Sequence, residues 1–256
     1  MTTNNKHTFA LYCPTLTAGQ PPKAENFFEC TDHVLWHRIV HILRLTAGEA
    51  ITLFDGRQEV TIRLSDKTFT GKNKISGVIQ STTASVPLAP AITLMPSLLK
   101  REAFEAAAYL AAAMGATTFQ PLIAAKTQRS WHTDKEHARL ANIMIAACEQ
   151  AKNFVIPELK PPISVTTVAD CHTTVRGVYF EDDGAPLMTI INQFITAPPP
   201  TLSLVFGPEG GLTADERRYL DTQGFVCCAL TPTILRAQDA VAVGLGSVRS
   251  LLKSNT

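Results

Sequence analysis

The sequence of 256 residues predicts an α/β fold in two parts, a small N-terminal domain rich in strands and a larger C-terminal domain around a parallel sheet. Short strand patterns with one helix fill the first third of the chain. The segment 81–90, STTASVPLAP, then has the composition of a linker. Beyond it, short apolar runs alternate with helical patterns, which is typical of a parallel sheet. We therefore expect one domain at residues 1–85 and a second at residues 90–256.

The composition indicates a folded protein without a strong charge. Hydrophobic residues make up 45% of the chain, charged residues make up 18%, and the formal net charge is +1. These values supply apolar cores and exclude a disordered chain or one that coats nucleic acid. No apolar stretch reaches the roughly 18 residues that a membrane span needs, and the N-terminus has no signal pattern. We expect a cytoplasmic protein with no membrane partner, whose six cysteines are reduced thiols that bind no metal.

In the first domain, the segment 32–45 predicts an amphipathic helix. The apolar side chains at helical spacing are Leu35, Ile39, Ile42 and Leu43. The polar side chains on the opposite face are His33, His37, His41 and Arg44. Further along, Asp55-Gly56 between the runs 50–54 and 57–64 predicts a hairpin, and residues 76–80 predict another strand.

The histidine face of this helix has two interpretations. It is either a solvated polar surface or a surface that contacts phosphates, to which Arg38, Lys72 and Lys74 add positive charge. A metal site is not expected, because no carboxylate that could orient the imidazoles is evident in the sequence.

In the second domain, strands and helices alternate in order. A strand at 91–96 leads into an alanine-rich helix at 98–114, which Gly115 ends. A second helix begins with a capping box at 133–136 and ends near Asn153.

The rest of this domain repeats the pattern. A third helix is opened by the capping box Thr213 to Glu216 and closed by Gly224. The remaining expected elements are strands at 175–180, 202–206 and 225–230 and a last helix at 238–253.

Two loops of the second domain carry the candidate site. The segment 202–216, LSLVFGPEGGLTADE, reads as strand, glycine-rich loop and capped helix, and the segment 230–240, LTPTILRAQDA, also joins a strand to a helix. Loops at the carboxyl ends of parallel strands line one crevice. The first loop lacks the endings of both common phosphate-binding glycine motifs, so a nucleotide-like ligand and a structural turn remain alternatives. Arg236 could act on a substrate or form a salt bridge with Asp239 or Glu209.

These motifs resemble the RsmE family of 16S ribosomal RNA uridine-N3 methyltransferases, in the SPOUT superfamily. The resemblance rests on GPEGG at 207–211, the T-x-x-E cap after it, and P-x-I-L-R at 232–236 before the final helix. The segments 39–56, IVHILRLTAGEAITLFDG, and 146–159, AACEQAKNFVIPEL, also match segments of that family in the correct order.

The resemblance implies a fold and an activity. It implies a PUA-like β-barrel that holds RNA, followed by a parallel-sheet domain with a trefoil knot that binds S-adenosylmethionine. It implies methylation of a uridine N3 in 16S ribosomal RNA of the small subunit. It also implies a homodimer with the last helix in the interface, where Gly244 and Gly246 would permit close approach.

The resemblance assigns roles to particular residues. Arg236 would be catalytic, stabilising charge on the pyrimidine. The cofactor-binding residues would be Phe206, Gly207, Pro208, Glu209, Gly210, Gly211, Leu230, Thr231, Ile234 and Leu235. Apart from the resemblance, the basic and histidine side chains of the chain give the expected RNA-binding residues Arg38, His41, Arg44, Lys72, Lys74 and Arg129.

The chain departs from the usual family residues at several polar positions. These positions are Leu110, Ala113, Asn153, Thr231, Thr233, Gln238 and Asp239. Two alternatives therefore stay open beside the main hypothesis: a non-catalytic RNA-binding protein of the same fold, and a methyltransferase that acts on a different RNA.

Overall fold

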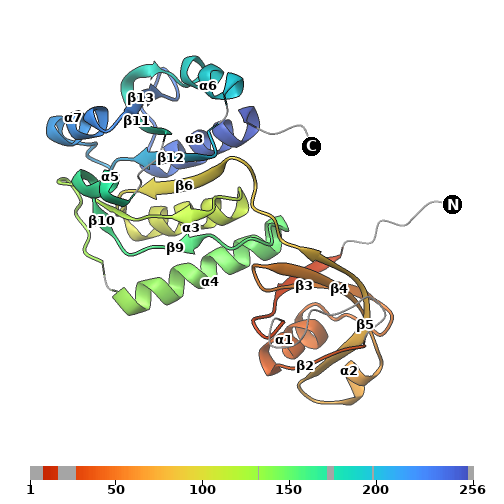
Figure 1. Cartoon of the computed structure of the whole chain (residues 1–256). Helices are drawn as coiled ribbons and strands as arrows, with labels where there is room; N and C mark the ends of the chain where they lie inside the picture. Colours follow the sequence, from red (N-terminus) through yellow and green to blue (C-terminus); the bar gives the residue numbers. More distant parts are fainter. Residues whose placement is uncertain (1–7, 17–26, 132, 172–175, 198, 253–256) are drawn as a thin grey trace. The chain divides into compact units, whose positions relative to one another are not determined.

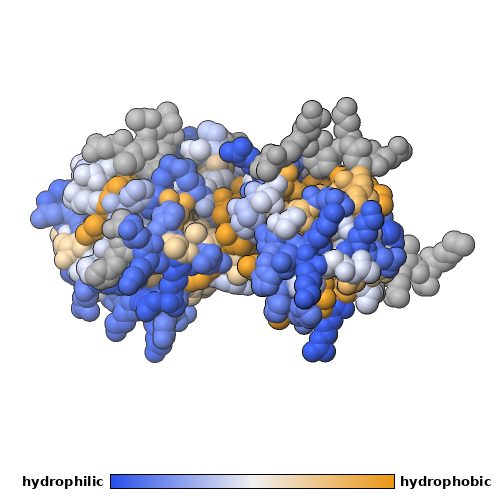
Figure 2. All heavy atoms as spheres, turned by 90° about the horizontal axis from the view of Figure 1, so that it is seen from below, coloured by the Kyte–Doolittle hydropathy of each residue, from blue (hydrophilic) through white to orange (hydrophobic). Residues whose placement is uncertain are grey.

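The computed structural model describes residues 8–16, 27–131, 133–171, 176–197 and 199–252 (Figure 1). The chain divides into two compact units, Met1–Val86 and Pro87–Thr256. Hydrophilic side chains dominate the face of the molecule that is seen from below the view of Figure 1 (Figure 2). Among the described residues, no helix is both long and apolar enough to cross a membrane.

The first unit is built on a mixed sheet of five strands. The strands are β1 (Phe9–Tyr12), β2 (Phe27–Thr31), β3 (Ala50–Phe54), β4 (Gln58–Leu64) and β5 (Lys74–Ala84). Their order in the sheet is β1-β3-β4-β5-β2, with β1 parallel to β3 and the other neighbours antiparallel. The predicted hairpin is confirmed as β3 and β4. A buried core that includes Ile51, Val60 and Ile62 lies on one side of it.

The two edges of this sheet approach each other through their side chains. β1 and β2 are the outermost of the paired strands. Cys13, directly after β1, and Cys30, in β2, nevertheless lie close enough for each thiol to shift the pKa of the other. The thiol of Cys30 lowers the pKa of Cys13 to about 7. The sheet is therefore strongly curved, although no backbone ladder joins its edges among the described strands.

The expected helix at 32–45 has a different form. It consists of an α-helix, α1 (His33–His37), and a π-helical turn, η1 (Arg38–Ile42). Asp32 caps it by accepting from the amide of Leu35. The wider π turn rotates the later residues, so Ile42 is 63% exposed and its predicted place on the buried face is wrong. A short helix, α2 (Lys67–Thr70), was not predicted.

The predicted linker is too long. Residues 81–84 continue strand β5 and pair with β4, where Ser81 lies opposite Thr61 and Ala84 opposite Gln58. Serine, threonine and alanine weakly specify local structure, so the available partner strand decides their conformation.

The second unit contains a parallel sheet of six strands. The strands are β6 (Ala91–Pro96), β7 (Thr118–Phe119), β9 (Glu158–Leu159), β11 (Arg176–Pro186), β12 (Thr201–Phe206) and β13 (Phe225–Ala229). Their order is β13-β11-β12-β6-β7-β9. A second small parallel pair is formed by β8 (Leu122–Ile123) and β10 (Ile163–Ser164). The predicted parallel-sheet α/β domain is confirmed.

Helices cover both faces of this sheet. Phe180 and Phe206 point to the face where α8 (Ala237–Leu251) packs, because a Cβ added at Gly244 would meet both rings. Tyr179 and Val205, one residue earlier in each strand, belong to the core on the other face. The helices packed there are α7 (Ala214–Thr222), η2 (Val165–Thr167) and α5 (Val168–Cys171). The helices beside α8 are α3 (Arg101–Ala113) and α6 (Leu187–Thr196), with α4 (Thr133–Ala151) packed on α3.

The helices of the second unit agree only in part with the prediction. The helix α3 begins at Arg101 rather than at Leu98, which is buried in the segment before it. The helix α6 was not predicted; it is short, rich in isoleucine and threonine, and has no side-chain cap. The capping box of α7 is confirmed, because Thr213 and Glu216 each accept from the other's backbone amide. The capping side chain predicted for α4 lies outside the described residues.

Candidate active site

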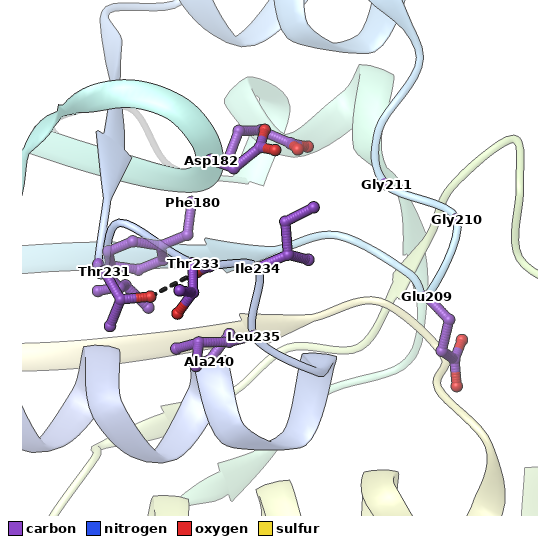
Figure 3. Close-up of a pocket in the computed structure, with 12 residues that line it drawn as sticks. Phe180, Asp182, Glu209, Gly210, Gly211, Thr231, Thr233, Ile234, Leu235 and Ala240 are labelled. Atoms are coloured by element: carbon purple, nitrogen blue, oxygen red, sulfur yellow. Dashed lines mark hydrogen bonds between the residues drawn. The ribbon is translucent and has the colours of Figure 1, made fainter.

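A cavity of about 330 Å³ lies at the carboxyl ends of β12 and β13 and beside a bulge in β11 (Figure 3). Because these strands are parallel, the segments that follow them meet at one edge of the sheet. The lining residues are Phe180, Glu181, Asp182, Glu209, Gly210, Gly211, Leu230, Thr231, Thr233, Ile234, Leu235 and Ala240. Its volume is in the range of small-molecule sites. If the glycine-rich loop were only a structural turn, the cavity beside it would have no explanation.

The loop after β12 turns sharply and is held from outside the cavity. The amide of Gly211 donates to the carbonyl of Pro208 (2.8 Å), and Gly211 has a φ of +69°, which favours glycine. The ammonium of Lys126 donates to the carbonyl of Gly210 (2.8 Å). The carboxylate of Glu209 accepts from the amide of Lys100 (2.9 Å). These contacts fix the backbone at the edge of the cavity.

The capped helix after this loop is tied to a distant segment. Glu216 is buried, and its two carboxylate oxygens serve different partners. One oxygen accepts from the amide and hydroxyl of Thr213, and the other accepts from the amide of Ala125 (2.6 Å). The capping box therefore also anchors the segment that carries Lys126.

A bulge in β11 supplies the third side of the cavity. Phe180 and Ala185 both lie opposite Cys228 of β13, so the residues between them are extruded from the ladder. A Cβ at Gly184 would be 2.5 Å from the Cys228 backbone, so only glycine fits at this return point. Outside the cavity, Asp183 accepts two hydrogen bonds from Arg217 (2.8 and 2.9 Å).

Glu181 is the half-buried carboxylate of this bulge. One of its oxygens accepts from the amide of Leu212 (3.1 Å). Burial of the carboxyl raises the pKa of Glu181 above its ordinary value, although the Leu212 amide and Arg217 act in the opposite direction. No lysine or arginine is among the described residues that line the cavity. The site is therefore acidic on one side and apolar at Leu230, Ile234 and Leu235.

The loop after β13 places Arg236 at the N-cap position of α8. In this loop the hydroxyl of Thr231 donates to the carbonyl of Thr233 (2.6 Å; Figure 3). Ile234 is 82% exposed at the edge of the cavity. Arg236 is also exposed but does not line the cavity, and its guanidinium makes no ion pair within the described part of the chain.

The predicted cofactor residues divide into two groups. Those that line the cavity are Glu209, Gly210, Gly211, Leu230, Thr231, Ile234 and Leu235. Phe206, Gly207 and Pro208 do not line it; Phe206 is buried and stacks on Phe180 with ring centroids 4.6 Å apart.

Sequence reasoning missed part of the cavity. The missed residues are Phe180, Glu181, Asp182, Thr233 and Ala240. A signal for Glu181 and Asp182 was present, because they follow the strand predicted at 175–180 as the other two loops follow their strands.

The two glycines of the last helix have different surroundings within the second unit. A Cβ at Gly244 would be 2.9 Å from Cζ of Phe206 and 3.3 Å from Cζ of Phe180. A Cβ at Gly246 would meet only Met114, at 3.9 Å. Gly244 therefore permits close approach of α8 to the sheet of its own domain.

The predicted RNA-binding residues lie in both units. In the first unit, the imidazole rings of His37 and His41 are 5.0 Å apart, and Lys74 pairs with Glu29 (2.9 Å). Arg38 and the exposed residues Arg44 and Lys72 belong to the same unit. No group of three metal-ligating side chains occurs among the residues described.

Arg129 lies in the second unit and is held by its own domain. Its guanidinium forms an ion pair with Glu136, donates to the carbonyl of Leu99 (3.4 Å) and lies over the ring of Phe104. These contacts position Arg129 within the fold of the second unit.

One departure from the family pattern has a structural role. The side-chain amide of Asn153 donates to the carbonyl of Ala112 (2.7 Å), near the end of α3, and to that of Val155 (3.2 Å). Thr231 and Thr233, two further departures, line the cavity.

Relatives with the same domain are known. Residues 86–249 match the family model described as RNA methyltransferase domain. The ribosomal RNA small subunit methyltransferase E of Mycobacterium bovis is 28% identical over 214 residues, which cover 81% of this chain and 80% of that protein. The protein of the same name from Bacillus subtilis is 26% identical over 252 residues, covering 93% and 94%.

Solved structures share the fold. The ribosomal RNA small subunit methyltransferase E from Neisseria gonorrhoeae, bound to S-adenosyl methionine, has a TM-score of 0.81 and 24% identity and covers 98% of this chain and 100% of its own. A methyltransferase from Legionella pneumophila has a TM-score of 0.77 and 24% identity, covering 95% and 98%. The resemblance to the RsmE family is confirmed, and the chain belongs to the family of RNA methyltransferases defined by this domain.

Proposed function

We propose that the chain transfers a methyl group from S-adenosylmethionine to N3 of a uridine in 16S ribosomal RNA of the small subunit. The observation that carries the proposal is the cavity that the GPEGG loop and the TPTILR loop form together, within a domain of the RNA methyltransferase family. Relatives named for methylation of small-subunit ribosomal RNA, and a fold shared with a cofactor-bound structure, support it.

The residues of the cavity suit this cofactor. The ring of Phe180 and the side chains of Leu230 and Leu235 offer an apolar surface to an adenine. Glu181 and Asp182 offer negative charge to a ligand that carries a sulfonium and an ammonium. S-adenosylmethionine, when bound, would supply an already activated methyl group.

The chain's own residues would position and stabilise the acceptor. Loss of the N3 proton to water places negative charge on the pyrimidine oxygens. The backbone of Arg236 is fixed at the start of α8, and its guanidinium is available to donate to one of these oxygens.

The proposal also covers features of the whole protein. They are the PUA-like character of the curved first unit, the trefoil knot, the homodimer, the cytoplasmic location, and RNA binding by Arg38, His41, Arg44, Lys72, Lys74 and Arg129.

Two experiments test the proposal. Calorimetry should detect S-adenosylmethionine binding, and purified small subunits that lack the modification should accept its labelled methyl group. Nucleoside analysis of the product should find the label on uridine N3. Cofactor binding without transfer to any RNA would favour the non-catalytic alternative, which the departures at Gln238 and Asp239 motivate. Transfer of the methyl group only to an RNA other than 16S ribosomal RNA would favour the alternative of a methyltransferase with a different RNA substrate.

A further inference from the structure

The cavity has an uneven charge. Carboxylates of Glu181, Asp182 and Glu209 line it, and no lysine or arginine does so among the described residues. Glu209 already accepts from the amide of Lys100, and Figure 3 shows it away from Phe180 and Leu235. Asp182 is exposed, so solvent screens its charge. Glu181 is half-buried, and it therefore exerts the strongest field in the cavity.

The fold holds Glu181 in place. The bulge between Phe180 and Ala185 projects it, and the amide of Leu212 fixes one oxygen at 3.1 Å. Arg217 anchors the neighbouring Asp183 from α7. Burial raises the pKa of Glu181, so its carboxylate lacks part of the solvation it would have in water. A bound cation would replace that lost solvation.

The proposed reaction changes the charge of the molecule in this cavity by one unit. The N3 electron pair forms the new bond to the methyl carbon, the N3 proton goes to water, and the pair of the broken S–C bond stays on sulfur. The sulfonium thereby becomes an uncharged thioether. The adenosyl and amino-acid parts are the same before and after transfer, so the sulfur charge and the methyl group are the only differences.

We propose that Glu181 makes the cavity select the positively charged cofactor over its uncharged product. The inference rests on the proposed function and adds a specificity-determining residue to it. Attraction to Glu181 is present with the sulfonium and absent with the thioether. Methyl transfer itself therefore removes part of the binding affinity and favours product release.

The test compares the dissociation constants of S-adenosylmethionine and S-adenosylhomocysteine by calorimetry. In Glu181→Gln the amide oxygen still accepts from Leu212, so shape is kept and only charge is lost. We expect the cofactor to bind roughly tenfold more weakly, as for the loss of one partly screened charge pair. The product should change less than twofold. An analogue with a protonated amine in place of the sulfonium should follow the cofactor.

Asp215→Asn is the control. It removes a charge of the same sign from an exposed position on α7 that does not line the cavity, and we expect the ratio of the cofactor and product dissociation constants to change by less than roughly threefold, as for a charge screened by solvent. The inference would be overturned if the two variants changed the ratio of the cofactor and product dissociation constants equally. It would also be overturned if Glu181→Gln weakened the binding of cofactor and product by the same factor. Failure of the wild-type chain to bind either molecule would overturn the proposed function instead, and the inference with it.

A titration of the wild-type protein covers the case in which Glu181→Gln does not fold. The charged groups that act on Glu181 are Asp182, Asp183 and Arg217, and the nearby thiol of Cys227 on β13 has its pKa raised by burial and stays uncharged as the pH falls from neutrality. Because the pKa of Glu181 is raised, its charge is lost early as the pH falls from neutrality. The preference for cofactor over product should shrink in that range. A preference that stays constant through the whole titration of Glu181 would contradict the proposal.

Discussion

Arg236 stands at the junction of the cavity loop and α8. The sequence left open a salt bridge to Asp239 or Glu209, and no such ion pair forms among the described residues. Glu209 instead accepts from the amide of Lys100. The backbone of Arg236 is fixed by the helix start, whereas its side chain is available to a second substrate.

Replacing Arg236 with alanine should therefore separate chemistry from binding. We expect the cofactor dissociation constant to stay nearly unchanged, since Arg236 does not line the cavity. Methyl transfer should fall by roughly a hundred- to a thousandfold, the usual loss for one oxyanion-type donor. Single-turnover transfer and calorimetry on the same preparation measure the two quantities.

The control for this variant is Arg218→Ala. Arg218 is exposed on α7 and pairs with Asp215 at the surface. Its loss should leave transfer and melting temperature within experimental error. If Arg236→Ala lowered the melting temperature but kept the activity per folded molecule, a structural role would replace the catalytic one.

At the level of helices and strands, the close packing of α8 on the sheet depends on Gly244. Alanine there would press on the ring of Phe206, which stacks on Phe180 at the cavity. Overpacking costs about 1–3 kcal/mol, which exceeds the gain of about 1 kcal/mol from better helix propensity. We expect Gly244→Ala to lower the free energy of unfolding in urea and to weaken cofactor binding.

Gly246→Ala in the same helix is the matched comparison. Its Cβ would make only ordinary contact with Met114, so the propensity gain should remain and stabilise the protein by up to about 1 kcal/mol. If Gly244→Ala and Gly246→Ala changed the free energy of unfolding in the same direction, packing against Phe206 would not be the cause of the Gly244→Ala effect.

Arg249 joins the end of α8 to the end of α3. Its guanidinium donates to the carbonyls of Met114 (3.0 Å), Pro90 (2.7 Å) and Gly115. The carbonyls at a helix C-terminus lack intrahelical partners and favour a positive charge. Burial lowers the pKa of Arg249 to about 10, which still leaves it charged at neutral pH.

Arg249→Met should destabilise the second unit by about 2–3 kcal/mol, because the carbonyls lose charged donors that water replaces poorly. The midpoint of urea unfolding measures this change. Arg218→Met, which removes an exposed arginine, should change stability by less than about 0.5 kcal/mol. Equal effects of the two substitutions would assign no special role to the buried contact.

For the whole molecule, the exposed apolar side chains of the second unit motivate the predicted homodimer. Met188 and Ile195 on α6 are 51% and 50% exposed, and Val243 on the adjoining α8 is 37% exposed. Apolar groups that gather on a surface mark contact sites. Sedimentation at micromolar concentration should give a species of twice 27.8 kDa.

Ile195→Glu should shift this equilibrium towards the monomer, since a charge would be buried in the contact. Val78→Glu places the same charge on an equally exposed residue of the first unit and should have no effect. A wild-type protein that sediments only at 27.8 kDa would contradict the dimer.

The sequence by itself determined the features that depend on short-range signals. The hairpin at Asp55-Gly56, the capping box of α7 and the end of that helix at Gly224 follow from residues close together in the chain. The alternation of strands and helices predicted the parallel sheet, and its two glycine- and proline-marked loops predicted most of one cavity wall. The turn and the caps are local features, because their hydrogen-bonding groups find partners in residues close by in the chain.

The tertiary structure alone decided which distant residues meet. The bulge that carries Glu181 exists because β11 pairs with β13 on both sides of it, and Gly244 is required because two rings lie beneath it. Arg249 reaches the carbonyls of residues more than a hundred positions away. Long-range contacts of this kind depend on the packing of whole elements, so no local pattern of residues specifies them.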